Sequence, residues 1–277
     1  MIPAKFDYER ADSVGAAVAL LQQHGDDAKL LAGGHSLLPL MKLRLASPGV
    51  LVDIGRLSDL SYVREDGDHV AIGALTRHHD VANAALLDEH CPIVSHTAGL
   101  IGDPQVRHMG TIGGSVAHGD PASDMPTVLL ALDASFTAQG PSGTREIAAG
   151  EFFSGLFETA LNPDEVLTEI RVPKTGGRGW SYQKFQRRSQ DWAIVGVAAV
   201  LTGENGNAAV AYTNMAEAPF RASAVEQALS SGSDAAAASQ QAAEGTNPPS
   251  DTFASAEYRR ALASVLVRRA LEEASSR

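Results

Sequence analysis

The scarcest informative residue in this sequence is cysteine, which occurs once in 277 residues, at position 91. A single thiol excludes an internal disulfide, and it cannot supply the several ligands that an iron–sulfur cluster or a cysteine-rich structural zinc site requires. If the protein takes part in redox chemistry, an organic cofactor must therefore carry it.

Basic residues are also few, since 22 Lys and Arg stand against 33 Asp and Glu and give a formal net charge of -11. Nucleic acids and anionic membranes are bound by surplus Lys and Arg, so this balance argues against both and favours a small molecule or a protein as the partner. No apolar run reaches membrane-spanning length, and the first residues lack the apolar core of a secretion signal. We therefore expect a cytoplasmic protein without a membrane span.

The chain is long enough for a substantial core and about two domains. Val14, Val18 and Leu21 recur at helical spacing after Ser13, which predicts a capped helix that ends at Gly25. Apolar runs bounded by Gly and Pro predict strands in the first two thirds of the chain. These predicted strands are residues 28–32, 49–54, 69–75, 134–139, 144–149 and 165–173, of which 134–139 and 144–149 form a hairpin and the last is ended by Pro173. Further helices are predicted at 91–101 and from Asp124.

Residues 174–179, KTGGRG, predict a hinge or linker. The stretch at 231–250 is rich in Ala, Ser, Gln and Pro and predicts a weakly ordered surface loop, after which 255–273 form an amphipathic helix. Between the hinge and this loop we predict a second sheet of three strands, at 180–188, 192–201 and 208–215, the last two joined by a turn at 203–207.

The first stretch that points to ligand binding is LLAGGHS at 30–36. Gly33 and Gly34 let backbone N–H groups converge on an anion, and Ser36 adds a hydroxyl donor. The dinucleotide fingerprint GxGxxG is excluded, because its third glycine is absent and Pro39 stands where its helix should run. Taken alone, the stretch is explained equally well by a Gly-Gly turn that leaves a strand.

A second stretch at 110–126 repeats this composition within a predicted glycine-rich loop at 110–123. Two such loops could hold one pyrophosphate from both sides, while a carboxylate takes ribose or ribityl hydroxyls. Two structural alternatives remain open, a helix N-cap for Asp124 and a simple turn for Asp120 before Pro121. The residues of this stretch that suit such a ligand are a glycine pair, two nearby hydroxyl residues and two carboxylates: Gly113, Gly114, Thr111, Ser115, Asp120 and Asp124.

The histidines do not predict a metal site. His35, His108 and His118 lie in or beside the two stretches, but none has the HExxH spacing of a metal-binding helix. Residues 77–79, RHH, predict the start of an exposed helix. No Ser-His-Asp set and no GxSxG elbow is present, so we predict neither a metal ligand nor a catalytic residue in this chain.

Two residues of the second predicted sheet are further candidates. Lys184 lies among basic neighbours on a strand, where it suits an anionic cofactor group, although a solvated strand face explains it as well. Trp192 stands at a strand entrance, where it either packs in the core or stacks near a planar ring.

Four segments together resemble a known family over nearly the whole chain. The segments AGGHSLLPLMKLRL, IGDPQVRHMGTIGGSVAHGDPASDMP, LTEIRVP and AEYRRALASVLVRRAL resemble the FAD-binding medium subunit of molybdenum hydroxylases, most closely the aerobic carbon monoxide dehydrogenase type. The resemblance implies an α+β fold. Residues 1–176 would form an FAD-binding domain of the vanillyl-alcohol-oxidase or PCMH type, built of two α/β subdomains. Residues 177–277 would form a C-terminal domain of a three-stranded sheet with helices.

The resemblance also implies a set of FAD contacts. Both motifs would wrap the pyrophosphate, Ile101 and Leu167 would contact the adenine end, Asp124 a cofactor hydroxyl, and Lys184 the region of the flavin. The cofactor-binding residues expected on this basis are Ala32, Gly33, Gly34, His35, Ser36, Ile101, Thr111, Ile112, Gly113, Gly114, Ser115, Asp120, Asp124, Leu167, Lys184 and Trp192.

Two positions depart from the family pattern. Ser115 replaces the usual Asn of TIGGN, and Trp192 falls where carbon monoxide dehydrogenase-type subunits carry a Tyr beside the isoalloxazine ring. The backbone arrangement should tolerate the first change. The second keeps an aromatic face with a different polar tip, so access to the flavin or its redox tuning could differ.

The implied function is electron transfer. FAD would take electrons from a small [2Fe-2S] subunit and pass them to a quinone, NAD or another acceptor, while a large molybdenum-cofactor subunit hydroxylates the substrate. The expected assembly is a dimer of large, medium and small subunits. The alternatives are a medium subunit for a purine, heterocycle or aldehyde substrate, a stand-alone flavin oxidase with FAD attached through His35, and a cofactor-free scaffold subunit.

Overall fold

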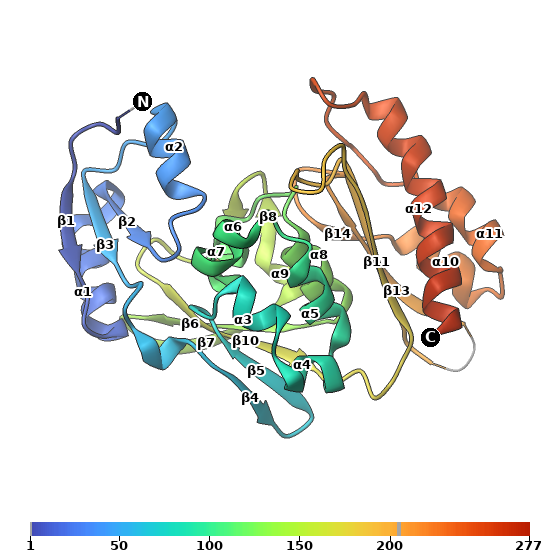
Figure 1. Cartoon of the computed structure of the whole chain (residues 1–277), viewed down its shortest axis with the longest axis horizontal. Helices are drawn as coiled ribbons and strands as arrows, with labels where there is room; N and C mark the ends of the chain where they lie inside the picture. The colour runs from blue at the N-terminus through green and yellow to red at the C-terminus, as the bar shows by residue number, and fades with distance from the viewer. Residues whose placement is uncertain (1, 204–205) are drawn as a thin grey trace.

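The computed structural model describes residues 2–203 and 206–277, which form three sheet-containing units side by side (Figure 1). The N-terminal unit is a parallel sheet in the order β1-β3-β2. As predicted, a helix follows Ser13, whose hydroxyl accepts a hydrogen bond from the Ala16 N–H at 3.1 Å. The elements of this unit are β1 (Asp7–Arg10), α1 (Val14–His24), β2 (Ala28–Leu31), α2 (Leu37–Leu43) and β3 (Val50–Asp53).

The central unit is a sheet in the order β4-β5-β10-β6-β7, with short helices packed over it (Figure 1). The predicted hairpin is β6 and β7, and the predicted strand that Pro173 ends is β10. Its strands are β4 (Val63–Asp66), β5 (His69–Gly73), β6 (Ser135–Gly140), β7 (Gly143–Ala148) and β10 (Val166–Pro173), with a separate pair β8 (Phe153–Gly155) and β9 (Glu158–Thr159). Its helices are α3 (His78–Ala82), α4 (Ala85–His90), α5 (Pro92–Gly99), α6 (Pro104–Met109), α7 (Ile112–His118), α8 (Asp124–Ala131) and α9 (Ala149–Phe152).

The C-terminal unit is a sheet in the order β11-β12-β13-β14 that is covered on both faces. Helix α8 packs on one face, and α12 lies on the other at the edge of the molecule (Figure 1). Ala198 and Val200 belong to the central core, whereas Val197 and Ala199 belong to the C-terminal core. These four residues lie on β12, whose continuous apolar run is explained by burial on both faces of the sheet. The elements are β11 (Trp180–Phe185), β12 (Val195–Leu201), β13 (Ala208–Thr213), β14 (Phe220–Arg221), α10 (Ser223–Ser230), α11 (Ala235–Ala238) and α12 (Ala256–Ser276).

Two sequence-based predictions for this unit were wrong. The sheet has a fourth strand, β14, whose two residues are too few to show a periodic pattern. Residues 231–250 are not a loose loop throughout, because α11 lies within them and Ala238 and Ala242 are fully buried in the C-terminal core. Small alanines fit a narrow space between helices that only the folded chain creates. The predicted turn at 203–207 falls partly outside the described residues.

The sequence-based argument against a dinucleotide-binding motif assumed that Pro39 prevents a helix after the first glycine stretch. That assumption was wrong. Helix α2 begins at Leu37, so Pro39 lies in its first turn, where a missing N–H costs little. The missing third glycine still distinguishes the stretch from GxGxxG. Among the described helices, none is both long and apolar enough to cross a membrane.

Candidate functional site

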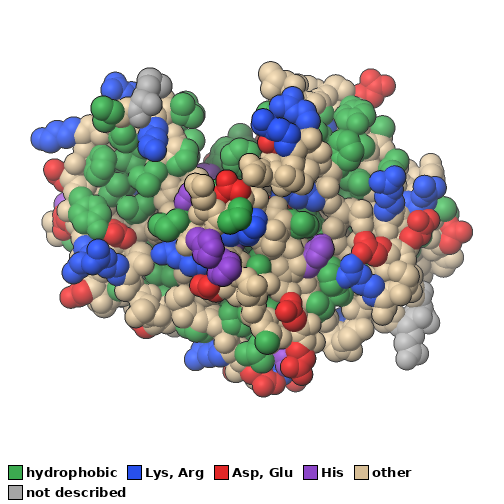
Figure 2. Space-filling model, viewed as in Figure 1, with side chains coloured by type: hydrophobic (Ala, Val, Ile, Leu, Met, Phe, Trp, Pro, Cys, Tyr) green, Lys and Arg blue, Asp and Glu red, His purple; other side chains and the backbone are tan. Residues whose placement is uncertain are grey.

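A cleft of about 860 Å³ lies where the three units meet. Figure 2 shows the hollow between the N-terminal lobe and the rest of the molecule. The volume is within the range of ~300–1,000 Å³ typical of ligand pockets. All the predicted cofactor residues line it except Gly34 and Ile112: Ala32, Gly33, His35, Ser36, Ile101, Thr111, Gly113, Gly114, Ser115, Asp120, Asp124, Leu167, Lys184 and Trp192.

The first glycine motif, residues 32–36, connects β2 to α2 and leaves a run of backbone donors free. Gly34 has a φ of 75°, a left-handed conformation that glycine adopts without strain. Within residues 2–203 and 206–277, the N–H groups of 33–37 donate to no protein group. Successive N–H groups without partners beside a cleft form a binding place for an anion.

The second glycine motif, residues 111–115, is mostly helical, so the prediction of a loop over 110–123 was wrong for α7. The Thr111 hydroxyl caps this helix by accepting from the Gly114 N–H at 3.1 Å. The N–H of Ile112 donates to the Thr76 carbonyl at 3.0 Å, and that of Gly113 donates to the Ala74 carbonyl at 2.9 Å. These donors therefore hold the helix to the segment after β5 and are not available to a ligand.

The two motifs contact each other through Gly33. A Cβ placed on Gly33 would lie 2.3 Å from the Met109 carbonyl oxygen and 2.8 Å from the Cα of Gly110. Such distances are too short for any side chain, so glycine is required for the N-terminal unit to approach the central one. This close approach puts the free N–H groups of the first motif beside the second.

Asp124 is the centre of a buried network that joins the central and C-terminal units. Its carboxylate accepts from the Tyr182 hydroxyl at 2.6 Å and from the Lys184 ammonium at 2.7 Å, while Lys184 also donates to the Leu100 carbonyl at 3.1 Å. The side chains of Lys184 and Asp124 are only 4% and 6% exposed. The Tyr182 hydroxyl also lies 3.1 Å from that of Thr213.

This network decides two alternatives left open by the sequence. Asp124 is not a side-chain N-cap, since it is the first helical residue of α8 and its carboxylate is bonded to Tyr182 and Lys184. Lys184 is not on a solvated strand face, since it is buried. Burial raises the pKa of Asp124, whereas Lys184 and Tyr182 oppose this and favour its ionised form. Burial beside the carboxylate raises the pKa of Tyr182 well above its usual value, so Tyr182 remains a donor.

The remaining candidates take different positions around the cleft. Asp120 forms the turn predicted for it, with its carboxylate accepting from the Ala122 N–H at 2.9 Å. The Ser115 hydroxyl lies 2.6 Å from the Ser123 hydroxyl, so these two side chains share a hydrogen bond. Trp192 is 70% exposed at the rim, in the loop between β11 and β12, so packing in the core is excluded. His35 is exposed and lines the cleft.

Comparison with known proteins identifies this architecture. Residues 4–175 match the FAD binding domain in molybdopterin dehydrogenase, and residues 180–274 match the CO dehydrogenase flavoprotein C-terminal domain. The chain is 43% identical to the carbon monoxide dehydrogenase medium chain of Hydrogenophaga pseudoflava, with 100% of this chain and 99% of that one covered. It belongs to the FAD-binding medium chains of molybdenum hydroxylases.

Other members are similar in sequence and structure. The glyceraldehyde dehydrogenase medium chain of Sulfolobus acidocaldarius is 40% identical over 99% of each chain. A solved structure of carbon monoxide dehydrogenase from Hydrogenophaga pseudoflava superposes with a TM-score of 0.95 at 44% identity, covering 100% of this chain and 99% of that chain. Quinoline 2-oxidoreductase from Pseudomonas putida 86 superposes with a TM-score of 0.92 at 29% identity, covering 100% and 99%.

As a medium chain, the protein has FAD as its cofactor, and the cleft fits that group. The free N–H groups of 33–37 suit a pyrophosphate, and Asp124 supplies a carboxylate to the same cleft. Apolar side chains including Leu75, Leu161 and Leu167 line other parts of it and suit a flat ring. The Leu100 carbonyl binds Lys184, so Ile101 lies in the same part of the cleft as Lys184.

Sequence reasoning missed two buried residues of this site. Tyr182 was not considered, although the hydroxyl of a tyrosine on a strand needs a hydrogen-bond partner when it is buried. His78 was placed at an exposed helix start, but it is 5% exposed and lines the cleft. It is buried because Arg77 pairs with Thr111 of the second motif, a contact that local sequence does not show.

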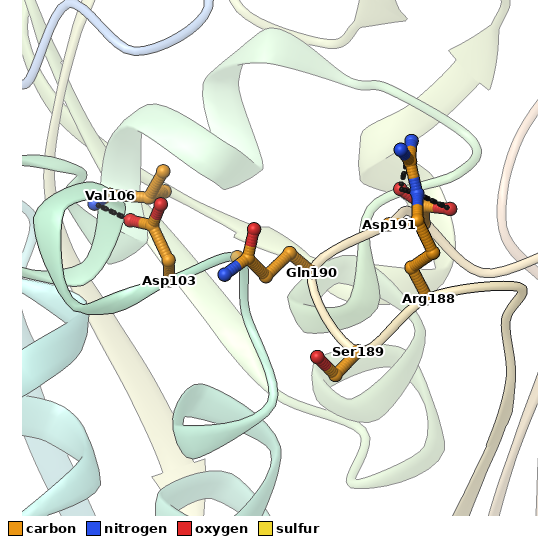
Figure 3. Close-up of a pocket in the computed structure, with 7 residues that line it drawn as sticks. Asp103, Val106, Arg188, Ser189, Gln190 and Asp191 are labelled. Atoms are coloured by element: carbon orange, nitrogen blue, oxygen red, sulfur yellow. Dashed lines mark hydrogen bonds and ion pairs between the residues drawn. The ribbon is translucent and has the colours of Figure 1, made fainter.

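A second pocket of about 520 Å³ adjoins the cleft and shares Gly102, Val106, Gln190 and Asp191 with it. Its charged groups bond to protein partners: Arg188 donates to Asp191 at 3.0 Å, and the Asp103 carboxylate accepts from the Val106 N–H at 2.9 Å (Figure 3). Across the described parts of the chain, no group of three or more His, Cys, Asp or Glu is placed to hold a metal ion.

Proposed function

We propose that this medium chain is the electron-transfer subunit of a molybdenum hydroxylase most like aerobic carbon monoxide dehydrogenase. The observation that supports this most is the convergence of both glycine motifs, Asp124 and Lys184 on one cleft, in a chain that matches carbon monoxide dehydrogenase medium chains over its full length. Bound FAD supplies the ability to accept electrons and to pass them on. The chain's own residues bind and orient it.

The proposed partners are a large molybdenum-cofactor subunit and a small [2Fe-2S] subunit, assembled as a dimer of such trimers in the cytoplasm. The single cysteine of this chain supports a separate iron–sulfur subunit, because one thiol cannot supply the ligands of a [2Fe-2S] cluster. The proposed acceptor is a quinone or NAD. We retain residues 1–176 and 177–277 as the proposed domains.

A medium chain alone does not select the substrate. Relatives named for carbon monoxide and for glyceraldehyde are 43% and 40% identical to this chain, a difference too small to separate the two. Medium chains of purine, heterocycle or aldehyde hydroxylases therefore form the second candidate function, and the large subunit decides between them.

The deciding experiment uses the complex purified with its native partners and kept without an acceptor. Carbon monoxide should bleach the visible absorption of the oxidised flavin, whereas glyceraldehyde or a nicotine-like heterocycle should not. If glyceraldehyde or the heterocycle bleaches the flavin and carbon monoxide does not, carbon monoxide is not the substrate and the compound that bleaches belongs to the substrate class. Absence of flavin bands after incubation of the chain with FAD would favour the scaffold alternative.

The stand-alone oxidase alternative concerns His35, which is exposed to the cleft within the first motif. We propose that FAD is bound without a covalent bond. After acid precipitation, the yellow colour should be recovered in the supernatant. Colour that stays with the precipitate of the native protein, but not of His35→Ala, would identify His35 as the attachment point.

A further inference from the structure

His78 is fixed between the two glycine motifs. Its backbone N–H donates to the Gly110 carbonyl at 3.0 Å. A Cβ placed on Gly110 would lie 3.0 Å from Cδ2 and 3.4 Å from Nε2 of the His78 ring. Since Gly33 also packs against Gly110, the His78 ring and the free N–H groups after Gly33 lie around the same residue and line the same cleft.

The two ring nitrogens of His78 have different surroundings. Nδ1 is enclosed by protein, and within residues 2–203 and 206–277 it has no hydrogen-bond partner. Nε2 also makes no hydrogen bond there but is not enclosed, and the cleft is the space that His78 lines. Nδ1 is closed to any ligand, so its lack of a partner says nothing about the cleft. Nε2 is a polar atom without a protein partner in the described chain, it lies beside a binding cleft, and it is the atom that a ligand can reach.

The charge state of His78 is set by its neighbours. Burial, together with the charge of Arg107 and the neighbouring His35 ring, lowers the pKa of His78 to about 4, so the His78 ring is neutral at pH 7 and carries one N–H. An unpartnered acceptor at Nδ1 is tolerated better than an unpartnered N–H. The favoured tautomer therefore has its proton on Nε2, directed to the cleft.

We propose that His78 is a further cofactor-binding residue that donates its Nε2–H to a phosphate oxygen of FAD. It would act together with the free N–H groups of 33–37. A neutral donor suits this place, because Arg107 already supplies positive charge nearby. The proposal rests on FAD as the ligand of the cleft, and it adds a side-chain donor to a motif that otherwise offers backbone donors.

The test measures the dissociation constants of FAD and of riboflavin, which has no phosphate, with the full chain freed of cofactor. His78→Ala should weaken FAD binding about 10- to 100-fold, the effect of losing a hydrogen bond to a charged group. Riboflavin binding should change less than about threefold. His78→Gln, which keeps an N–H donor, should recover most of the FAD affinity.

The matched control is His79→Ala. His79 lies on the same helix but stacks on His108 at 4.0 Å and does not line the cleft, so its removal should leave FAD binding unchanged. Thermal unfolding of every variant shows whether the chain is folded. Equal loss of FAD and riboflavin in His78→Ala, or unchanged FAD binding in a folded His78→Ala, would overturn the proposal. A native chain that binds no FAD would instead contradict the proposed function.

Discussion

Residues 32–36 and 111–115 are both glycine-rich and both line the cleft, but their backbone N–H groups have different partners. In the first motif the N–H groups of 33–37 have no protein acceptor in the described chain. In the second, those of Ile112, Gly113 and Gly114 are bonded to Thr76, Ala74 and Thr111. We therefore propose that the first motif binds the ligand through its backbone, whereas the second motif supports the first and presents side chains.

The largest expected effect concerns Asp124, at the start of the helix after the second motif. Asp124→Asn leaves the Lys184 charge buried without its carboxylate, which should lower the free energy of unfolding by about 3–5 kcal/mol. Urea unfolding of the cofactor-free chain measures this. Asp120→Asn is the control, since asparagine can keep the turn that Asp120 forms, and it should change stability by less than about 0.5 kcal/mol. Equal stability of the two variants would contradict the role of Asp124 as an anchor.

The next effect tests the packing of the second motif. A Cβ on Gly113 would lie 2.5 Å from the Cβ and from the carbonyl oxygen of Ala74, so Gly113→Ala should lower the free energy of unfolding by about 1–3 kcal/mol. Gly15→Ala, also within a helix but with open space around it, should instead raise stability by up to about 1 kcal/mol. A stable Gly113→Ala variant would mean that α7 can shift, and the supporting role of the motif would be wrong.

A third variant separates stability from binding in the first motif. Gly34→Ala forces a side chain into a φ of 75°, which costs roughly 1–2 kcal/mol and turns the neighbouring N–H groups. FAD should then bind about tenfold more weakly in a fluorescence titration. Gly67→Ala is matched to it, because Gly67 has a φ of 59° in the turn between β4 and β5, away from the cleft. Gly67→Ala should lose similar stability and bind FAD normally. Weak FAD binding in both variants would contradict the proposal that the first motif binds FAD through its backbone.

The smallest effect concerns the cap of the second motif. Thr111→Ala removes the side-chain acceptor of the Gly114 N–H and should lower stability by about 1 kcal/mol, with a change of less than about threefold in FAD affinity. Thr111→Ser keeps the hydroxyl and should behave as the native chain in both measurements. If Thr111→Ala instead bound FAD tenfold more weakly at unchanged stability, Thr111 would be a ligand-binding residue, and the contrast between the motifs would disappear.

Much of the fold followed from local sequence. The helix capped by Ser13, the hairpin of β6 and β7 and the strand that Pro173 ends were all predicted, because caps, turns and prolines act within a few residues. The capping of α7 had a local signal as well, a threonine directly before the helix, but the glycines that follow it favoured a loop. Strand β14 and the burial of Ala238 depend on distant segments and were missed.

The sequence by itself determined the family, the cofactor and most of the residues that line the cleft, because motif order and spacing are properties of the chain. Tertiary structure alone decided which motif keeps its N–H groups free, that Lys184 is paired with Asp124, and that His78 is buried. Each of these depends on a contact between segments far apart in sequence. Hydrogen-bond partners and burial are set by such contacts, and the residue types in a motif do not specify them.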